Sequence, residues 1–209
     1  AGARVMTSSS GPGISLMQEG ISFLAAAQLP CVVVNIMRGG PGLGGIQPSQ
    51  SDYFQATKGG GHGDYHMLVL APHTVQEAVL LTIEAFDLAD KYRNPVMILG
   101  DGFLGQMMEP VEFKKTPPKL PTKAWALTGA KRRHQNVIRT LYLDPVALEK
   151  VNLEINRKMQ EIVRNEVRVE TYQTDDAEVI IAAYGTVARI AKTAIKVLRE
   201  EGIKVGLVR

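Results

Sequence analysis

The sequence predicts an α/β fold built on a parallel sheet that helices cover on both faces. Short apolar runs rich in β-branched residues alternate with longer stretches of helical periodicity, which is the pattern of repeated β-α-β units. The run 31–37 is nearly uniformly apolar, as expected for a strand buried on both faces of such a sheet. Because β-α-β crossovers are right-handed, we expect a doubly wound parallel sheet, then a linker and the start of a second α/β domain.

The first predicted unit runs from a strand at 3–7 to the strand at 31–37. A turn at 7–13, rich in serine and glycine, leads into a helix of about 15 residues, and Pro30 ends the connection. Apolar residues at helical spacing define the buried face of this helix. They are Ile14, Met17, Ile21, Leu24 and Ala25.

The second predicted unit consists of strands at 67–71 and 95–99 and the helix between them. Thr74, followed three residues later by Glu77, is a capping box, so the helix is expected to start there and to extend to about Arg93. The expected buried face of this helix comprises Val75, Val79, Ile83, Phe86 and Ala89.

A linker rich in proline and lysine comes next and leads into another helix. Asp144 and Pro145 form a good helix start, and the periodicity continues to about Asn165. The apolar stripe of this helix consists of Leu148, Val151, Ile155, Met159 and Ile162.

The last part is predicted to form a strand at 178–183, a helix at 186–201 and a strand at 203–208. We therefore divide the chain into a first α/β domain, a linker with its helix, and the start of a second α/β domain. Their ranges are 1–110, 111–176 and 177–209. Because both ends resemble the interior of β-α-β units, we expect the chain to be an excerpt from a longer protein.

Composition excludes several classes of protein. No apolar run reaches the ~20 residues that cross a bilayer, and no charged start with an apolar stretch marks a secretion signal. The single cysteine, Cys31, excludes an internal disulfide and any iron–sulfur site built from several thiolates of this chain. We expect a cytoplasmic protein with no membrane partner.

Positive charge is concentrated in the linker. Residues 111–143 carry eight basic side chains and one acidic side chain, whereas 1–110 carry five and nine. The basic part, Lys114–Arg139, also contains Pro117, Pro118 and Pro121. It has no nucleic-acid-binding module, so we expect no nucleic-acid partner. A solvated linker, or one that docks on an acidic partner subunit, fits its composition.

The segment Arg38–Gly45 follows the strand 31–37 directly and contains five glycines. Ligands of open α/β sheets bind beyond the carboxyl ends of the strands. An arginine there presents a fixed fork of donors that matches a carboxylate or phosphate, and glycines let the backbone approach a ligand closely. We predict that Arg38 binds a small anion. An ion pair with a neighbouring acid is the alternative.

The turn Thr7–Gly13 joins the end of a strand to a helix N-terminus, where backbone amides and the helix dipole favour an anion. The turn lacks both the P-loop pattern and Gly-x-Gly-x-x-Gly, and ordinary serine and glycine capping is the alternative.

Two other motifs suggest metal sites, and we interpret neither as one. Asp101 stands in a Gly-Asp-Gly triplet like that of magnesium–diphosphate motifs, but no asparagine follows before Asn136, so we expect a strand-end residue near the ligand crevice. His62, Asp64 and His66 alternate as metal ligands on a strand would. Their flanking glycines favour a mobile loop that gates the crevice.

No catalytic residue stands out. The chain shows no Ser-His-Asp order, no carboxylates paired at a useful spacing and no cofactor-binding lysine. Met107 and Met108 are expected to be packing or interface residues.

Several runs together resemble the α subunit of 2-oxoacid:ferredoxin oxidoreductases. They are Val5–Met17, Arg38–Pro41, Val69–Pro72, Tyr92–Pro95, Asp101–Pro110 and Ala183–Gly185. The resemblance covers essentially the whole chain. Details within Gly60–Tyr65 and Gly105–Pro110 are most similar to the branched-chain members, which act on 2-oxoisovalerate (3-methyl-2-oxobutanoate).

The resemblance implies thiamine diphosphate chemistry at a subunit interface. This chain would supply the pyrimidine-type domain, and a β subunit would supply the domain that binds the diphosphate and Mg. The complex would also contain γ and ferredoxin-like subunits, with iron–sulfur clusters in partner subunits only. A 2-oxoacid loses carbon dioxide, coenzyme A takes the acyl group, and electrons pass to ferredoxin.

The resemblance also implies roles for particular residues. The arginine that binds the substrate carboxylate falls on Arg38, and Thr7, Ser8 and Ser9 would line the cofactor side of the crevice. Residues 177–209 would begin a domain that resembles the C-terminal domain of transketolase.

The chain departs from the family pattern in three respects. The loop after Arg38 continues with Gly42 and Leu43, where 2-oxoglutarate enzymes more often have Ser-Thr. The Tyr-Pro-Ile-Thr-Pro motif, whose threonine contacts the substrate, is absent from this sequence. The glutamate that polarises the aminopyrimidine ring is expected before Ala1. We therefore expect the chain alone to be inactive.

The remaining alternatives concern substrate and class. A 2-oxoglutarate enzyme needs a second cation, and only Lys58 accompanies Arg38 in the first crevice loops, which favours a branched-chain acid. Two further functions stay open. One is a non-catalytic assembly subunit that keeps Arg38 in a structural ion pair, and the other is a phosphate or nucleotide binder that uses the turn Thr7–Gly13.

Overall fold

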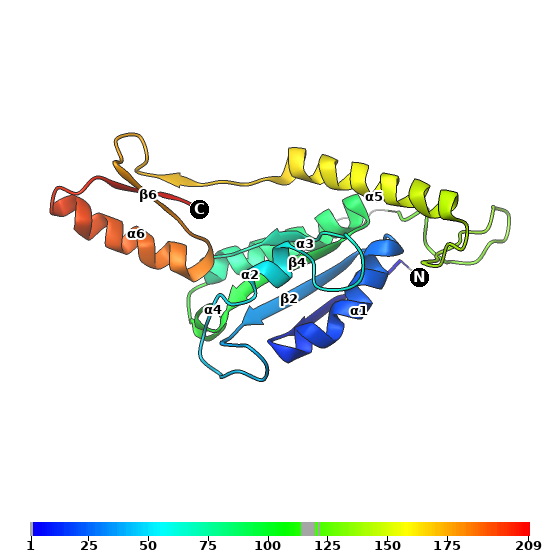
Figure 1. Ribbon diagram of the computed structural model, residues 1–209, viewed down its shortest axis with the longest axis horizontal. Coiled ribbons are helices and arrows are strands. Elements are labelled where there is room, and N and C mark those ends of the chain that lie inside the picture. Colours follow the sequence, from blue (N-terminus) through cyan, green and yellow to red (C-terminus); the bar gives the residue numbers. More distant parts are fainter. Residues whose placement is uncertain (1, 114–119, 121) are drawn as a thin grey trace.

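The computed structural model describes residues 2–113, 120 and 122–209, which form two sheets and their helices (Figure 1). The larger sheet is entirely parallel and has the order β1-β2-β4-β3. Its strands are β1 (Met6–Ser9), β2 (Cys31–Met37), β3 (Leu68–Leu70) and β4 (Pro95–Asp101). The predicted α/β fold with a parallel sheet is confirmed.

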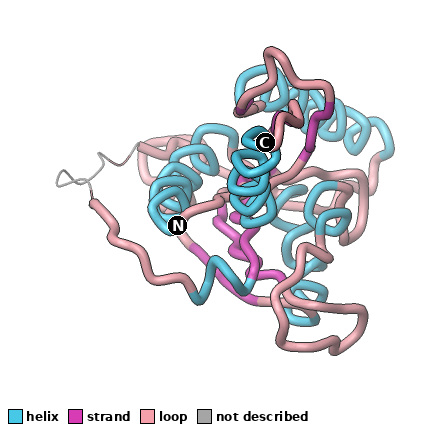
Figure 2. The backbone as a smooth tube through the Cα atoms, turned by 90° about the vertical axis from the view of Figure 1, so that its left-hand side faces the viewer, coloured by secondary structure: helices cyan, strands magenta, loops and turns pink. Residues whose placement is uncertain are grey.

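Helices lie on both faces of the larger sheet (Figure 2). Helix α1 (Pro12–Ala26) packs on one face against alternate residues of β2, including Val33 and Met37. Helix α3 (Val75–Tyr92) packs on the other face against a core that includes Val32. Because β2 lies between β1 and β4, both of its faces are buried, as its apolar sequence predicts.

Strand β1 differs from the predicted strand at 3–7. Its pairing with β2 begins at Met6, because Arg4 instead binds Asp87 and Asp90 on α3, at 2.5 and 2.8 Å. Since β1 is an edge strand with one neighbour, most of its side chains are exposed. The displaced start places Thr7 inside the strand.

The start of α3 was predicted correctly, and its buried face was predicted in part, because Ala89 is buried and Phe86 packs against the core as expected. The Thr74 hydroxyl accepts a hydrogen bond from the amide of Glu77 at 3.0 Å, as a helix cap does. The residues of α3 that are buried are Ala85, Leu88, Ala89 and Tyr92, whereas Ile83 is exposed. The first half of α3 is apolar on more than one side, so its periodicity allowed two faces, and packing against the sheet selected one.

Helix α5 (Pro145–Glu166) begins and ends close to the predicted positions, with Asp144 accepting from the amide of Val146 at 3.2 Å. Only the last turns of its apolar stripe reach the core, where Ile162 is buried and Met159 packs beside it. In Figure 1, α5 runs along the top of the larger sheet and its helices. The remaining members of the stripe are exposed or half-buried.

The second sheet has the order β5-β7-β6 and lies beside α6 (Gly185–Glu200) at the left of Figure 1. Its strands are β5 (Thr171–Tyr172), β6 (Val179–Ala182) and β7 (Val205–Val208). The pair β6–β7 is parallel, as predicted. Strand β5 was not predicted because two residues carry no periodicity, and it pairs with β7 in antiparallel orientation.

Among its described residues, the segment between β4 and α5 contains one helix, the short α4 (Gly102–Gln106). The linker prolines Pro117, Pro118 and Pro121 lie outside the described residues. Within the part of the chain that the structure describes, no helix is long and apolar enough to cross a membrane.

Candidate functional site

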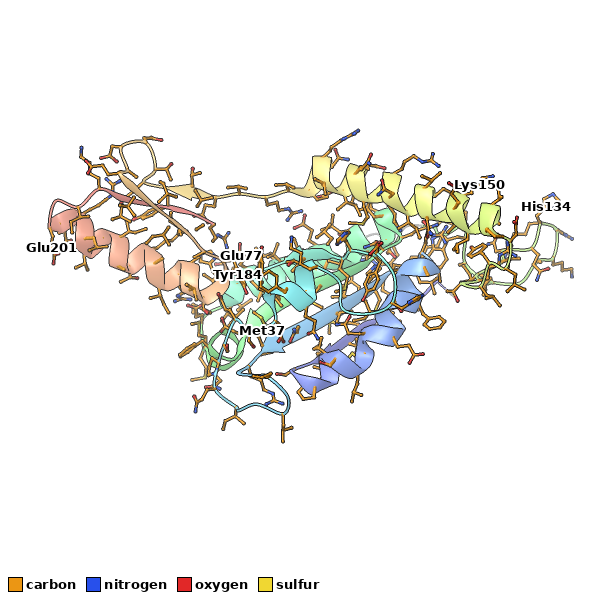
Figure 3. The ribbon with its side chains drawn as sticks, viewed as in Figure 1. Met37, Glu77, His134, Lys150, Tyr184 and Glu201 are labelled. Atoms are coloured by element: carbon orange, nitrogen blue, oxygen red, sulfur yellow. The ribbon has the colours of Figure 1, made fainter. Side chains whose placement is uncertain are left out.

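The carboxyl ends of β1, β2 and β4 meet at one edge of the larger sheet, where the candidate site lies. The loop after β2 returns to this edge and leads into the short helix α2 (Tyr53–Thr57). We call the second sheet and α6 the second module. In Figure 3, Met37 marks the end of β2, and Tyr184, the residue before α6, points toward the same region. The edge is therefore built from loops that are far apart in the sequence.

Arg38 is held in place by neutral groups. Its Nη1 donates to the carbonyl oxygens of Leu43 and Gly45, at 2.6 and 2.5 Å. The loop closes behind it, because the Ser51 hydroxyl donates to the Arg38 carbonyl at 2.8 Å and Pro48 forms a bridge with Arg38. Within residues 2–113, 120 and 122–209, no carboxylate lies within ion-pairing distance of this guanidinium. Among these described residues, Arg38 therefore forms no structural ion pair, which was the alternative to anion binding.

The guanidinium faces a cavity of about 200 Å³. One wall comes from Arg38 and the loop 39–43, and the other comes from Gly11, Pro12, Ser15 and Asp52. A Cβ on Gly11 would lie 3.1 Å from both Nε and Nη2 of Arg38, and the φ of Gly11 is 53°. Glycine at this position therefore lets the turn and the guanidinium lie against each other. The Nε and Nη2 atoms donate to no described residue.

Thr7, Ser8 and Ser9 lie within β1, one after another. Because side chains alternate along a strand, Thr7 and Ser9 face α1 and Ser8 faces the opposite side. The Thr7 hydroxyl lies 3.9 Å from the sulfur of Met17, and a Cβ on Gly13 would lie 2.0 Å from the Ser9 hydroxyl. The structure brings Thr7 and Ser9 to the same face and separates Ser8 from them.

The amides at the start of α1 are already engaged. Gly13 donates to the Ser10 carbonyl at 3.2 Å, and Ile14 donates to the Gly11 carbonyl at 3.0 Å. The Ser10 hydroxyl is buried and has no hydrogen-bond partner among the described residues. The predicted anion-binding turn thus offers fewer backbone donors than its sequence indicates.

Asp101 connects the larger sheet to the second module. One carboxylate oxygen accepts from the amides of Phe103 and Leu104, at 3.0 and 3.2 Å, which caps α4. The other accepts from the hydroxyl of Thr186 at the start of α6. Asp101 is 3% exposed, and these three donors are the hydrogen bonds that its buried carboxylate accepts from described residues. It ends β4 at the crevice edge, as predicted.

His62 and Asp64 lie exposed in the loop that precedes β3, and His66 lies nearer to that strand. Among the residues that the structure describes, no group of three or more histidine, cysteine, aspartate or glutamate side chains is arranged to hold a metal ion. The base of the loop is fixed, because the Tyr65 hydroxyl donates to Gln18 on α1 at 2.9 Å.

Two residues of the site, Asn35 and Asp52, were not predicted. Asn35 is 0% exposed in β2, and its amide donates to Asp52 at 3.0 Å. The only sequence signal is a single asparagine inside an otherwise apolar strand. Such a buried polar side chain needs a partner, but the sequence does not identify Asp52 as that partner.

Tyr184 was recognised only as part of a family motif. Its backbone carbonyl accepts from Gln50 at 2.9 Å, and its ring lies 5.7 Å from that of Tyr53. Burial raises the pKa of Tyr184 to about 12, with contributions from Tyr53, Asp101 and Asp52. Its hydroxyl is buried and has no hydrogen-bond partner in the described part of the chain. Tyr184 thus joins the second module to the site.

Comparison with known protein families gives matches along nearly the whole chain. Residues 1–174 match the family described as pyruvate flavodoxin/ferredoxin oxidoreductase, thiamine diphosphate binding. Residues 177–209 match pyruvate:ferredoxin oxidoreductase core domain II.

Individual relatives agree with these matches. The chain is 53% identical to the ketoisovalerate oxidoreductase subunit VorB of Methanothermobacter marburgensis, over all of this chain and 60% of that protein. It is 35% identical to the 2-oxoglutarate synthase subunit KorA of Methanocaldococcus jannaschii, over all of this chain and 63% of that protein. The chain therefore spans about three fifths of the length of these curated relatives.

A solved structure has the same fold. It is the 2-oxoglutarate:ferredoxin oxidoreductase from Magnetococcus marinus with 2-oxoglutarate, coenzyme A and succinyl-CoA bound. The TM-score is 0.78 at 26% sequence identity, over 99% of this chain and 41% of that chain.

Proposed function

The chain belongs to the pyruvate flavodoxin/ferredoxin oxidoreductase family, and we propose that it is part of the α subunit of a 2-oxoacid:ferredoxin oxidoreductase. The proposed reaction is the oxidative decarboxylation of 3-methyl-2-oxobutanoate to an acyl-CoA, with electrons passed to ferredoxin. The identity of 53% to a ketoisovalerate subunit, against 35% to a 2-oxoglutarate subunit, supports the branched-chain acid.

The observation that carries the proposal is the guanidinium of Arg38. It lies at the carboxyl edge of the sheet, is oriented by two backbone carbonyls, and has no described carboxylate as a partner. A 2-oxoacid carries one carboxylate, which matches the fork of donors on the unused side of the guanidinium. Arg38 would bind and orient the substrate through this carboxylate.

The residues at this edge fit one end of thiamine diphosphate. When bound, the cofactor supplies the electron sink for loss of carbon dioxide from a 2-oxoacid. Two buried polar atoms near the ends of β1 and β2, the Ser10 hydroxyl and the Asn35 carbonyl oxygen, lack partners among the described residues. These two atoms are free to form hydrogen bonds with the polar ring of the cofactor. Thr7, Ser8 and Ser9 are proposed to line the cofactor side, with Ser8 on the opposite face of the strand.

The diphosphate and Mg require another chain in this proposal. The described residues hold no cluster of metal-ligating side chains. We propose that a β subunit supplies that half of the site and that γ and ferredoxin-like subunits complete the complex. The iron–sulfur clusters would lie in partner subunits only and pass electrons to ferredoxin. The relatives are themselves named as subunits, which supports a multi-subunit complex. We propose the cytoplasm as its location.

Side chains near Arg38 support an aliphatic substrate. Leu43 and Ile46 follow Arg38 in the same loop and are 79% and 86% exposed, so they are available to pack against a ligand or a partner chain. A 2-oxoglutarate enzyme needs a cation for the second carboxylate. The nearby basic residue Lys58 lies beyond α2 and is exposed, outside the cavity of Arg38.

The three parts predicted from the sequence are retained as the proposed domain organisation. They are the pyrimidine-type domain (1–110), the linker with its helix (111–176) and the start of a second domain (177–209). The family matches change at residues 174–177, which supports the second boundary.

The test is an assay of the complete subunit, produced together with its neighbouring subunits. Coenzyme A-dependent reduction of ferredoxin or a viologen dye is measured over a panel of 2-oxoacids. We expect the highest kcat/KM with 3-methyl-2-oxobutanoate, and a loss of about 100-fold or more in Arg38→Ala because a charge-assisted contact is removed. Lys58→Ala is the matched control. A preference for 2-oxoglutarate would overturn the proposed substrate, and an inactive, cofactor-loaded complex would favour a non-catalytic assembly subunit.

A further inference from the structure

We propose that Asp52 is a second recognition residue of the Arg38 cavity, and that the cavity also binds a small 2-amino acid. Its carboxylate would bind Arg38 and its ammonium group would bind Asp52. The inference goes beyond the proposed reaction, whose substrate is a 2-oxoacid, and rests on that proposal only for the role of Arg38 as a carboxylate-binding residue.

The cavity carries opposite charges that do not neutralise each other. Arg38 and Asp52 both line this cavity of about 200 Å³, yet they form no ion pair. Arg38 uses one nitrogen for two backbone carbonyls, and Asp52 uses one oxygen for Asn35. The remaining polar atoms of both side chains have no hydrogen-bond partner among the described residues. A ligand with an anionic end and a cationic end satisfies both.

Asn35, on strand β2, holds the Asp52 carboxylate in position. Asp52 occupies the cap position of α2, but its side chain makes no capping hydrogen bond to that helix. It accepts instead from the amide of Asn35, at 3.0 Å. An aspartate at this position ordinarily caps the helix, so the contact with Asn35 replaces a common local contact with one that directs the carboxylate to the end of β2.

Asn35 is difficult to explain as a stabilising residue. It is fully buried in a strand whose neighbours are apolar, and its carbonyl oxygen has no partner in the described part of the chain. Burying a polar group with an unmet hydrogen bond is destabilising. Local departures of this kind are expected at functional sites, where they hold another residue in place. Asn35 thus serves to orient Asp52.

The chemistry of the ligand follows from the hydrogen-bonding capacity of Asp52. An ionised carboxylate only accepts hydrogen bonds, so it attracts an ammonium group and gains nothing from the carbonyl oxygen of a 2-oxoacid. The cavity is small compared with the sites of drug-sized ligands, which suits a small metabolite. L-Valine has the carbon skeleton of 3-methyl-2-oxobutanoate with an amine in place of the 2-oxo group, and it is therefore the probe.

The experiment measures direct binding to the assembled complex by calorimetry, which does not depend on turnover. L-Valine is compared with 3-methylbutanoate, which has the same carboxylate and branched chain but no amine. We expect Asp52→Asn to weaken valine binding at least tenfold more than it weakens 3-methylbutanoate binding, and Arg38→Ala to weaken both. The asparagine keeps an oxygen that accepts from Asn35, so the loop is retained. Asp175→Asn, at an exposed position between β5 and β6, is the control and is expected to change neither.

Each outcome decides the proposal. No binding of valine to the wild-type complex, or an equal loss for both ligands in Asp52→Asn, would overturn it. Valine binding that survives Arg38→Ala would place the amino acid elsewhere and would also overturn it. A complex that binds valine in this Asp52-dependent manner but oxidises no 2-oxoacid would leave this inference standing and refute the proposed function.

Discussion

Arg38 and Arg209 use the same side chain in opposite ways. Arg209, next to the end of β7, donates to both carboxylate oxygens of Glu77 at 2.8 Å and to Glu170 at 2.8 Å. Arg38 donates only to backbone carbonyls and faces a cavity. The Arg209 guanidinium is neutralised by acids and joins the second sheet to α3. The Arg38 guanidinium is positioned but not neutralised, which is the condition for binding an external carboxylate.

The surroundings of Glu77 show how strongly the Arg209 cluster is paired. Burial by itself would raise the pKa of Glu77, but hydrogen bonds from Arg209 and His73 outweigh burial and lower it to about 2. The pKa of Glu170 is also lowered, first by Lys192 and then by Arg209. This cluster is a structural junction.

The largest expected effect on stability comes from breaking that junction. Glu77→Ala leaves Arg209 partly buried without its bidentate partner, so we expect the free energy of unfolding to fall by about 3 kcal/mol. Urea denaturation measures the change. Glu149→Ala, at an exposed position of α5, is the matched control and should change stability by less than about 0.5 kcal/mol. Equal losses in the two variants would show that the junction contributes no special stability.

Acid should weaken the same junction. The pKa of Glu77 in the folded chain is about 2, below its ordinary value of 4.5. Its stabilising contribution is therefore fully present above about pH 4.5 and is lost as the pH falls toward 2. Unfolding followed across this range should show a steeper loss in the wild type than in Glu77→Gln, whose side chain does not titrate. Parallel curves for the two proteins would refute the assignment.

A smaller effect is expected from the link between the two regions. Thr186→Val removes the hydroxyl that donates to Asp101 and keeps the shape of the side chain. Because the buried carboxylate still has its two amide donors, we expect a loss of about 1–2 kcal/mol, measured by thermal denaturation. Thr193→Val, at an exposed position of the same helix, is the control. An unchanged stability in Thr186→Val would mean that this contact does not hold the modules together.

The two regions were not equally predictable from the sequence. Arg38 was proposed as a binding residue because it directly follows an apolar strand, and the carboxyl ends of such strands lie at ligand sites. Asp52 was missed because its role depends on contact with Asn35, which is 17 residues away. The contact between Arg209 and Glu77 spans 132 residues, and no local pattern indicates it. Features that depend on neighbouring residues in the sequence could therefore be predicted, whereas contacts between side chains far apart in the sequence could not.

Secondary structure shows the same division. The strand 31–37 was predicted with the bounds that β2 has, because its apolar run is short and ends at glycines. The buried face of α3 was predicted only in part, with Ala89 correct and Ile83 wrong, because the helix has apolar residues on more than one side and packing against the sheet selects the face. Strand β5 is too short to have a pattern and exists through its pairing with β7.

Arg38 is proposed to bind the substrate carboxylate, whereas Arg209 holds the second sheet against α3. The most direct test measures kcat/KM for 3-methyl-2-oxobutanoate and the free energy of unfolding in both Arg38→Ala and Arg209→Ala, in the assembled complex. We predict that Arg38→Ala lowers kcat/KM about 100-fold and costs less than about 1 kcal/mol of stability, since only contacts to exposed carbonyls are lost. Arg209→Ala should lose about 2–3 kcal/mol of stability. A loss of stability in Arg38→Ala as large as that in Arg209→Ala, with kcat/KM retained, would contradict the account.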